Sequence, residues 1–323
     1  MFPFLLYGSA GCDEKSQYHV LSGQKHTYYR VTYNHPHDLS EGIRFIYDIF
    51  YESLNPFDPQ STISKVNNNE EIALDEIFIE AFTRSIELAE KTKGAFDPTC
   101  SPLINLWGFG FEKSKEPSDS LINEIKEYVG YDKIVFKDGF VVKKDSRIQL
   151  NFSAIGDGFS CDIIASYLDS KGVSDYMVDI GGEIVTKGKN KAGIDWSVGI
   201  IKPPKCLGAD KPTEFETIIR MKDRMALATS RNYNNYRMRN GKRYGHAINP
   251  ATGCPVDNRI LSATVIAPDC ITADAYATAI MAVESEKLNE LLQVDSTLEY
   301  YIIYLDELDN YSIIQSKGIK AYM

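Results

Sequence analysis

Apolar side chains recur every three or four positions in three segments of the chain. Residues 39–54, 77–92 and 118–129 all show this spacing, which predicts amphipathic helices. Asn55-Pro56 ends the first of them, because proline cannot continue a helix. Two more helices are expected. One starts between Asp162 and Leu168 and ends near Gly172, and an apolar one covers residues 272–283.

Other segments have the apolar pattern of strands. Residues 18–33 alternate loosely, and residues 134–150 predict a hairpin that turns at Lys137-Asp138-Gly139. Further strands are expected at residues 176–184, 196–201, 216–220 and 261–267. Gly181-Gly182 interrupts the first of these, which indicates either a bulge or a ligand close to the backbone.

Helices and strands are mixed without strict β-α-β alternation, which favours an α+β fold over a doubly wound sheet. No internal repeat or low-complexity block divides the chain. We therefore expect residues 21–323 to form a single catalytic unit, a mixed sheet with packed helices.

Composition narrows the functional classes. The 323 residues are 43 % hydrophobic and 25 % charged, which is typical of a globular protein with a sizeable core. A net charge of -10 argues against a nucleic-acid partner, because phosphate contacts need a concentrated basic face. The sequence contains no run of 18 apolar residues, so it predicts no transmembrane helix.

The first 20 residues resemble a truncated lipoprotein signal and tether. An apolar start leads to Ser9-Ala10-Gly11-Cys12, which has the form of a lipobox. A basic first region and a longer apolar run are missing, so a simple apolar terminus is the alternative. If the lipobox is real, a lipid on Cys12 anchors the protein to a bacterial membrane, outside the cytoplasm and on the periplasmic face.

The other five cysteines form neither a CxxC pair nor a zinc-binding pattern. We expect buried free thiols at Cys100, Cys161, Cys206, Cys254 and Cys270.

One of the five histidines, His246, stands just before a turn formed by Asn249-Pro250 and Thr252-Gly253. An imidazole held beside a rigid turn suits proton transfer or phosphate contact, although a lone histidine near a turn more often has a structural role.

Two segments that contain closely spaced glycines are also candidates for ligand binding. Residues 94–110 combine glycines with aromatic residues, which suits a planar ligand or simply a tight turn over the core. Residues 151–162 predict a loop that enters a helix, where free backbone N–H groups can bind phosphate.

Asp274 and Thr278 are four residues apart and so share one face of a helix. A carboxylate and a hydroxyl placed in this way can bind a hard cation such as Mg²⁺. Local capping and back-bonding within the helix are the alternative.

Taken together, the motifs resemble the ApbE family of FAD:protein FMN transferases over roughly residues 25 to 320. The matching segments, in chain order, are Asn55 to Asn67, Gly94-Ala95-Phe96-Asp97-Pro98-Thr99, Ala154 to Asp162, Gly181-Gly182, Thr229-Ser230, His246 with Pro250-Ala251-Thr252-Gly253, and Ala273 to Thr278.

This resemblance implies a T-fold-related α+β body that binds FAD and Mg²⁺. The implied reaction moves FMN from FAD to a Thr or Ser hydroxyl of an acceptor flavoprotein subunit and releases AMP. The resemblance assigns Mg²⁺ to Asp274, Thr278 and the Ala154 carbonyl, and it makes His246 the catalytic residue. The implied FAD-binding residues are Asp97, Thr99, Trp107, Gly108, Asp157, Gly158, Asp162, Gly181, Gly182, Thr229, Ser230, Arg231 and His246.

Two positions depart from the family pattern. Asp157 stands where the family usually has Lys, and Arg231 stands where it usually has Gly. At about 4 Å and an effective dielectric near 20, each unit of charge changes an interaction by roughly 4 kcal/mol before solvent screening. Arg231 could restore the lost positive charge by pairing with Asp157, Asp157 could add a metal ligand, or both could face solvent.

Three other functions use the same fold. They are a flavin-binding protein without transferase activity, a Mg²⁺-dependent FAD pyrophosphatase that uses water instead of a protein hydroxyl, and a lipid-anchored structural or assembly protein.

Overall fold

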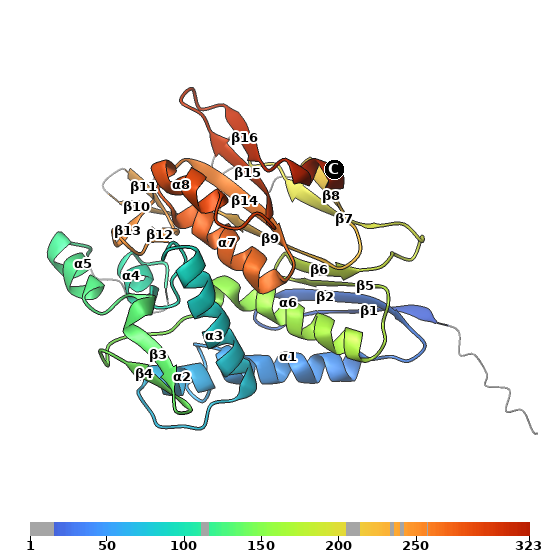
Figure 1. Ribbon diagram of the computed structural model, residues 1–323, viewed down its shortest axis with the longest axis horizontal. Coiled ribbons are helices and arrows are strands. Elements are labelled where there is room, and N and C mark those ends of the chain that lie inside the picture. The colour runs from blue at the N-terminus through green and yellow to red at the C-terminus, as the bar shows by residue number, and fades with distance from the viewer. Residues whose placement is uncertain (1–15, 111–115, 205–213, 233–235, 240–241, 257) are drawn as a thin grey trace, which may run out of the picture.

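A computed structural model describes residues 16–110, 116–204, 214–232, 236–239, 242–256 and 258–323. The described part centres on an eight-stranded sheet in the order β1-β2-β5-β6-β9-β14-β15-β16, in which all neighbouring strands are antiparallel (Figure 1). Its strands are β1 (Gln17–Gln24), β2 (Tyr28–His35), β5 (Tyr176–Ile180), β6 (Glu183–Lys187), β9 (Met225–Arg231), β14 (Ile260–Ala267), β15 (Glu299–Leu305) and β16 (Tyr311–Gln315).

Four two-stranded ribbons accompany the large sheet. They pair β3 (Ile134–Lys137) with β4 (Phe140–Lys143), β7 (Trp196–Ile201) with β8 (Phe215–Met221), β10 (Tyr236–Arg239) with β11 (Lys242–Gly245), and β12 (Ile248–Asn249) with β13 (Cys254–Pro255). The helices are α1 (Ser40–Leu54), α2 (Thr62–Asn67), α3 (Glu76–Lys91), α4 (Ser101–Leu106), α5 (Asp119–Lys126), α6 (Ser153–Ser170), α7 (Cys270–Ala282) and α8 (Ser285–Leu292), with 3₁₀ turns η1 (Tyr131–Lys133) and η2 (Gly318–Tyr322).

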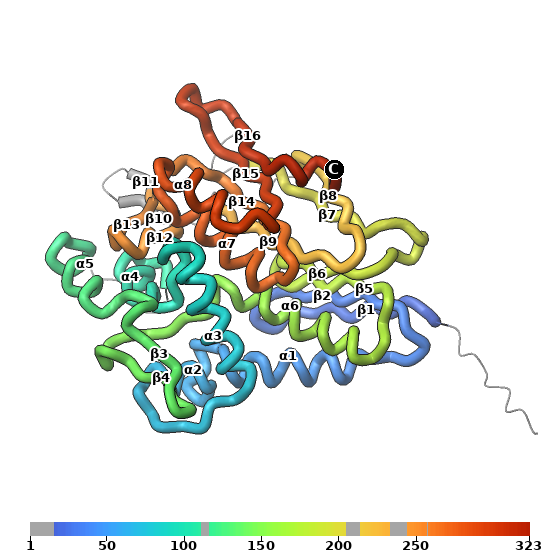
Figure 2. The backbone as a smooth tube through the Cα atoms, in the orientation of Figure 1, coloured from blue at the N-terminus to red at the C-terminus, as the bar shows by residue number. Residues whose placement is uncertain are grey.

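Helices α6 and α7 lie side by side on one face of the sheet (Figure 2). Helix α7 packs on β9 and β14, and α6 packs on β5 and β6. Every residue of α7 except Thr278 is buried, as expected for a helix that is apolar on all sides. The core therefore fixes α7 firmly, and its one partly open position is a polar residue.

The α+β fold class is confirmed, and so are several predicted elements. Helices α1, α3 and α5 begin and end within a few residues of the predicted bounds. The predicted hairpin after residue 134 is also present, although it ends at Lys143 and not near residue 150. In the described part of the chain, no helix is long and apolar enough to cross a membrane.

Two strand predictions were wrong in the same way. Residues 18–33 form two strands, β1 and β2, and residues 176–187 form β5 and β6. Gly181 and Gly182 are therefore the turn of a hairpin and not a bulge, with φ of 68° and 111°. Only glycine adopts such angles without strain, so this pair marks where the chain reverses.

The predicted loop over residues 151–162 is mostly helix, because α6 begins at Ser153. Gly156 and Gly158 suggested a loop, since glycine disfavours helix interiors by roughly 1 kcal/mol. Packing overrides this preference at Gly158, where a Cβ would lie 2.6 Å from the carbonyl oxygen of Cys270 on α7.

The thiol prediction is confirmed for Cys100, Cys161 and Cys270, which are free and buried, whereas Cys254 is free but partly exposed. Cys206 and the lipobox at residues 9–12 lie outside the described residues, so the predicted tether remains a prediction.

Candidate active site

A cavity of about 340 Å³ opens where the first turns of α6 meet α7. It is lined by Ala95, Phe96, Asp97, Cys100, Ile104, Phe109, Ser153, Ala154, Asp157, Glu183, Ser230, His246, Ala247, Ile248, Pro250, Asp274, Thr278, Met281 and Ala282. The cavity therefore combines a polar floor of carboxyl and hydroxyl groups with apolar walls, as small-molecule sites commonly do.

Three contacts at regular spacing join α6 to α7. Asp162 accepts hydrogen bonds from the backbone N–H groups of Cys270 (2.9 Å) and Ile271 (2.8 Å). One turn along, the Gly158 N–H donates to Asp274 Oδ2 at 3.2 Å. These contacts proceed toward the start of α6 as they proceed along α7, so the two helices run in opposite directions.

The third contact lies at the cavity. Thr278 Oγ1 is 3.5 Å from the Ala154 carbonyl oxygen, and it is also 3.5 Å from Ser230 Oγ on β9. The three residues that the sequence associated with Mg²⁺ are thus brought together from two helices.

Three carboxyl groups converge on the cavity floor. Burial raises the pKa of Asp157 to about 6. Burial, followed by the charge of Asp157, raises the pKa of Glu183 to about 8. Burial and then the charges of Glu183 and Asp157 raise the pKa of Asp274 well above its usual range. These carboxyl groups resist ionisation together, so a bound cation would relieve their repulsion.

The Gly181 turn brings two of these carboxyls close together. A Cβ on Gly181 would collide with Asp157 Oδ2 and would lie 3.0 Å from Glu183 Oε2. Among the described residues, neither Lys nor Arg lines the cavity. An anionic ligand such as a pyrophosphate would therefore need a cation to accompany it.

The oxygen atoms at the floor suit Mg²⁺. The Asp274 carboxylate, the Thr278 hydroxyl and the Ala154 carbonyl are hard ligands of the kind that Mg²⁺ takes alongside water and phosphate oxygens. Within the described ranges, no three His, Cys, Asp or Glu side chains form a metal-binding group.

An aromatic basin of about 210 Å³ adjoins the cavity and shares Ser153 and Asp157 with it. Phe57 stands at this basin with 67 % of its surface exposed. The His26 and Tyr51 rings stack there with centroids 4.0 Å apart. The basin is lined by His26, Thr27, Phe50, Tyr51, Leu54, Asn55, Pro56, Phe57, Phe152, Ser153, Gly156 and Asp157.

Comparison with known proteins shows which family has this architecture. The model of the ApbE family matches residues 26–302. The chain belongs to the ApbE family. It is 31 % identical to an FAD:protein FMN transferase of Vibrio cholerae, over 97 % of this chain and 95 % of the relative. It is also 31 % identical to the protein of that name from Haemophilus influenzae, over 92 % of this chain and 90 % of the relative.

Solved ApbE structures have the same fold. The flavin transferase ApbE of Vibrio cholerae superposes with a TM-score of 0.83 at 30 % identity, covering 95 % of this chain and all of that one. The ApbE protein of Thermotoga maritima gives a TM-score of 0.79 at 25 % identity, covering 95 % of this chain and 99 % of that one.

Several residues that the ApbE resemblance assigned to FAD do line the cavity. Asp97, Asp157, Ser230 and His246 are among them. The His246 ring meets Phe109 edge-on at 6.3 Å between centroids. The loop that Asn249-Pro250 predicted therefore delivers the imidazole to the cavity.

Asp97 is also engaged by its own loop. Its carboxylate accepts hydrogen bonds from Thr99 N (2.8 Å), Thr99 Oγ1 (2.6 Å) and Tyr131 N (3.0 Å). Thr99 is completely buried and accepts a further bond from the Gly130 N–H, at 2.7 Å. Asp97 thus shapes the cavity wall, and Thr99 is a structural partner outside the lining.

Trp107 and Gly108 also lie outside the cavity lining. Trp107 Nε1 donates to the Gly253 carbonyl at 2.8 Å, and its ring packs on Tyr244 at 5.3 Å between centroids. The predicted stacking surface is therefore a brace under the loop that carries His246, and Gly108 is the adjoining turn, with φ of 79°.

Most of the remaining assigned residues do not line the cavity but contact the elements that form it. Gly158 and Asp162 join α6 to α7, and Gly181 and Gly182 form the turn against Asp157. Thr229 Oγ1 bonds to Thr264 Oγ1 at 2.9 Å between neighbouring strands. These residues hold the cavity in shape without lining it.

Pairing of Arg231 with Asp157, one of the three possibilities, is not found, because burial alone raises the pKa of Asp157 and the Arg231 charge does not lower it. The guanidinium lies 3.8 Å from a Cβ placed on Gly182. Burial and then the Asp157 charge raise the pKa of Glu183, and the Arg231 charge offsets only a small part of that rise.

Sequence reasoning missed Glu183 as a residue of the site. A carboxylate directly after Gly181-Gly182, at the start of an otherwise apolar strand, was the available signal. Phe109 and Ser153 stand in the glycine-bearing segments that the sequence singled out, although neither was assigned to the site, whereas only the packing of α7 brings Met281 to the cavity.

Proposed function

We propose that this protein transfers the FMN half of FAD to a Ser or Thr hydroxyl of an acceptor flavoprotein and releases AMP, with Mg²⁺ required. The observation that carries the proposal is the meeting of Asp274, Thr278, the Ala154 carbonyl and His246 at one cavity, in a member of the ApbE family. Relatives that align over nearly the whole chain bear the name of this transferase.

In this reaction the acceptor hydroxyl oxygen forms a bond to the FMN phosphorus, and the phosphorus–oxygen bond to AMP breaks. Positioning and charge neutralisation dominate such phosphoryl chemistry. Bound Mg²⁺ would supply the positive charge that the described lining residues lack. Asp274, Thr278 and Ala154 would hold the ion.

His246 is the residue placed to accept the proton of the attacking hydroxyl or to contact the pyrophosphate. Ile104, Phe109, Ile248 and Met281 form the apolar wall beside it. The neighbouring aromatic basin offers rings for stacking a planar isoalloxazine, and Phe57 is its most exposed ring.

The test is the intact mass of an acceptor domain bearing a Ser or Thr flavinylation site, after incubation with this protein, FAD and MgCl₂. The expected result is a gain of one FMN that is lost with EDTA and with His246→Ala. Release of AMP and free FMN without a mass gain, when several acceptors are tried, would instead establish a pyrophosphatase. If FAD binds but is not turned over, the protein is a flavin carrier and not a transferase.

We also propose that Cys12 carries a lipid anchor on the periplasmic face of a bacterial membrane. The motif Ser9-Ala10-Gly11-Cys12 supports this proposal. Expression in a bacterium should place the wild type in the membrane fraction and Cys12→Ala in the soluble fraction. Equal fractionation of the two proteins would reject the anchor.

A further inference from the structure

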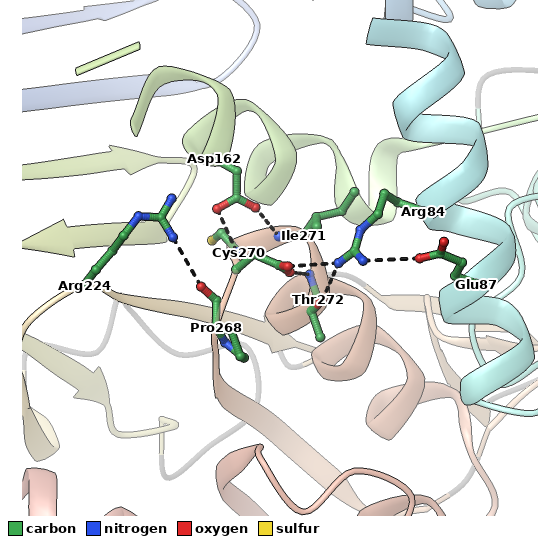
Figure 3. Close-up of polar contacts among 9 residues, drawn as sticks. Arg84, Glu87, Asp162, Arg224, Pro268, Cys270, Ile271 and Thr272 are labelled. Atoms are coloured by element: carbon green, nitrogen blue, oxygen red, sulfur yellow. Dashed lines mark hydrogen bonds and ion pairs between the residues drawn. The ribbon is translucent and has the colours of Figure 1, made fainter. Parts of the chain in front are cut away.

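The first turn of α7 receives side-chain acceptors from Asp162 on α6 (Figure 3) and from Asp269, the residue that caps α7. The first four N–H groups of any helix lack partners within it. Asp269, the residue before α7, accepts from Thr272 N at 3.0 Å through its side chain and from Ala273 N at 3.2 Å through its carbonyl. The N–H groups of Cys270 and Ile271 go to the two carboxylate oxygens of Asp162 on α6.

The position of Asp162 along α6 links this cap to the register between α6 and α7. Asp162, Gly158 and Ala154 follow one another at intervals of four residues, so they share one face of α6. Their partners on α7 are Cys270 with Ile271, then Asp274, then Thr278. Sliding either helix by one turn would break all three contacts at once.

We propose that Asp162 is a positioning residue, which sets the register of α6 against α7 and thereby the distance from the Ala154 carbonyl to Asp274 and Thr278. The inference rests on the proposed function for its catalytic consequence. Asp162 lies outside the cavity lining, so its effect passes through the helices and not through contact with FAD or Mg²⁺.

The geometry requires both carboxylate oxygens. Each oxygen of Asp162 accepts one N–H, and an amide at this position would turn its NH₂ group toward one of the two donors. A glutamate would keep both acceptors but add one methylene between the helices. Asp162→Asn therefore weakens the cap, whereas Asp162→Glu keeps the capping chemistry and changes the spacing.

Asp269 provides a matched control. It caps the same helix turn, and its carboxylate pairs with Arg84 of α3 at 2.9 Å, whereas the hydrogen bonds that join α6 to this turn come from Asp162. Asp269→Ala removes a cap of α7 and leaves the contact between α6 and α7 intact. A loss that Asp162→Asn shares with Asp269→Ala is a loss of capping alone.

The experiment measures Mg²⁺ affinity by isothermal titration calorimetry, kcat and KM for FAD, and thermal unfolding in the three variants. We expect Asp162→Asn and Asp162→Glu to weaken Mg²⁺ binding by about tenfold or more, the lower end for residues that orient metal ligands from outside. The kcat should fall in parallel while KM for FAD changes less. Asp269→Ala should lower Tm yet keep Mg²⁺ affinity within about twofold of the wild type.

Wild-type Mg²⁺ affinity and kcat in both Asp162 variants would overturn the proposal and leave Asp162 as an ordinary cap. If the wild type itself neither binds Mg²⁺ nor transfers FMN, the proposed function fails, and amide hydrogen exchange then decides the register. Faster exchange at residues 154–158 of α6 in Asp162→Asn, but not in Asp269→Ala, would support the positioning role. Equal exchange in the two variants would reject it.

Discussion

The Gly158 backbone N–H donates to Asp274 Oδ2 at 3.2 Å, across the interface between α6 and α7. This contact ties a cavity carboxylate to the helix that faces it. It exists because residue 158 has no side chain: a Cβ there would lie 2.6 Å from the Cys270 oxygen and 2.9 Å from the Asp274 Cβ. Close approach of the two helices is thus a condition of the site.

Gly158→Ala should therefore destabilise the protein by roughly 1–3 kcal/mol, the usual cost of overpacking, and should weaken Mg²⁺ binding. Gly156→Ala is the control in the same helix, since a Cβ at Gly156 meets nothing within 4 Å. That change should be neutral or stabilise by up to about 1 kcal/mol, because alanine favours helix. Urea unfolding of both variants checks this, and equal losses would contradict the packing argument.

Asp274→Asn should abolish most Mg²⁺-dependent FMN transfer, by about 100-fold or more. Without Mg²⁺ the variant should be at least as stable as the wild type, because it removes one of three carboxyls that repel one another in a buried place. The Asn oxygen can still accept the Gly158 N–H. Activity assays and thermal unfolding in EDTA measure the two effects, and a less stable variant in EDTA would show that the carboxylate has a structural role.

Stability without Mg²⁺ should fall as the pH rises from about 5 to 8. Folding raises the pKa of Asp157 from 3.8 to about 6 and that of Glu183 from 4.5 to about 8. A raised folded-state pKa favours the protonated fold, so its contribution is complete below about pH 4 and is lost as the pH passes the folded values.

Glu183→Gln should flatten this pH dependence by at least about 1.4 kcal/mol, the equivalent of one pKa unit. Tm measured against pH in EDTA, for the wild type and this variant, is the direct check. Added MgCl₂ should restore stability mainly at the higher pH, where the carboxyls are ionised. Parallel pH profiles for the two proteins would mean that Glu183 is not the group that titrates.

Phe57→Ala should raise KM for FAD by about tenfold if the aromatic basin holds the isoalloxazine, within the 1–3 kcal/mol typical of stacking on an aromatic side chain. Tm should change little, because 67 % of the Phe57 surface is exposed. Phe45→Ala on α1 is the control, with 64 % exposure and no place in the basin. Steady-state kinetics would contradict the assignment if both variants had the same KM.

The amino-acid sequence determined the α+β class, most helices and two of the residues proposed to bind the cation, Asp274 and Thr278. These features depend on local spacing: the apolar repeat in α1 and α3, the interval of four between Asp274 and Thr278, and the turn after His246. Each can be found because neighbours along one element have a fixed geometry.

Only the tertiary structure decided which of the chemically suggestive residues line the cavity. Trp107 and Thr99 are residue types common in binding sites, yet they brace loops, and Arg231 does not pair with Asp157. The start of α6 was hidden because its glycines oppose helix locally, and the gain from packing Gly158 against α7 is a long-range term. Contacts between segments more than 100 residues apart leave no periodic trace in a single sequence.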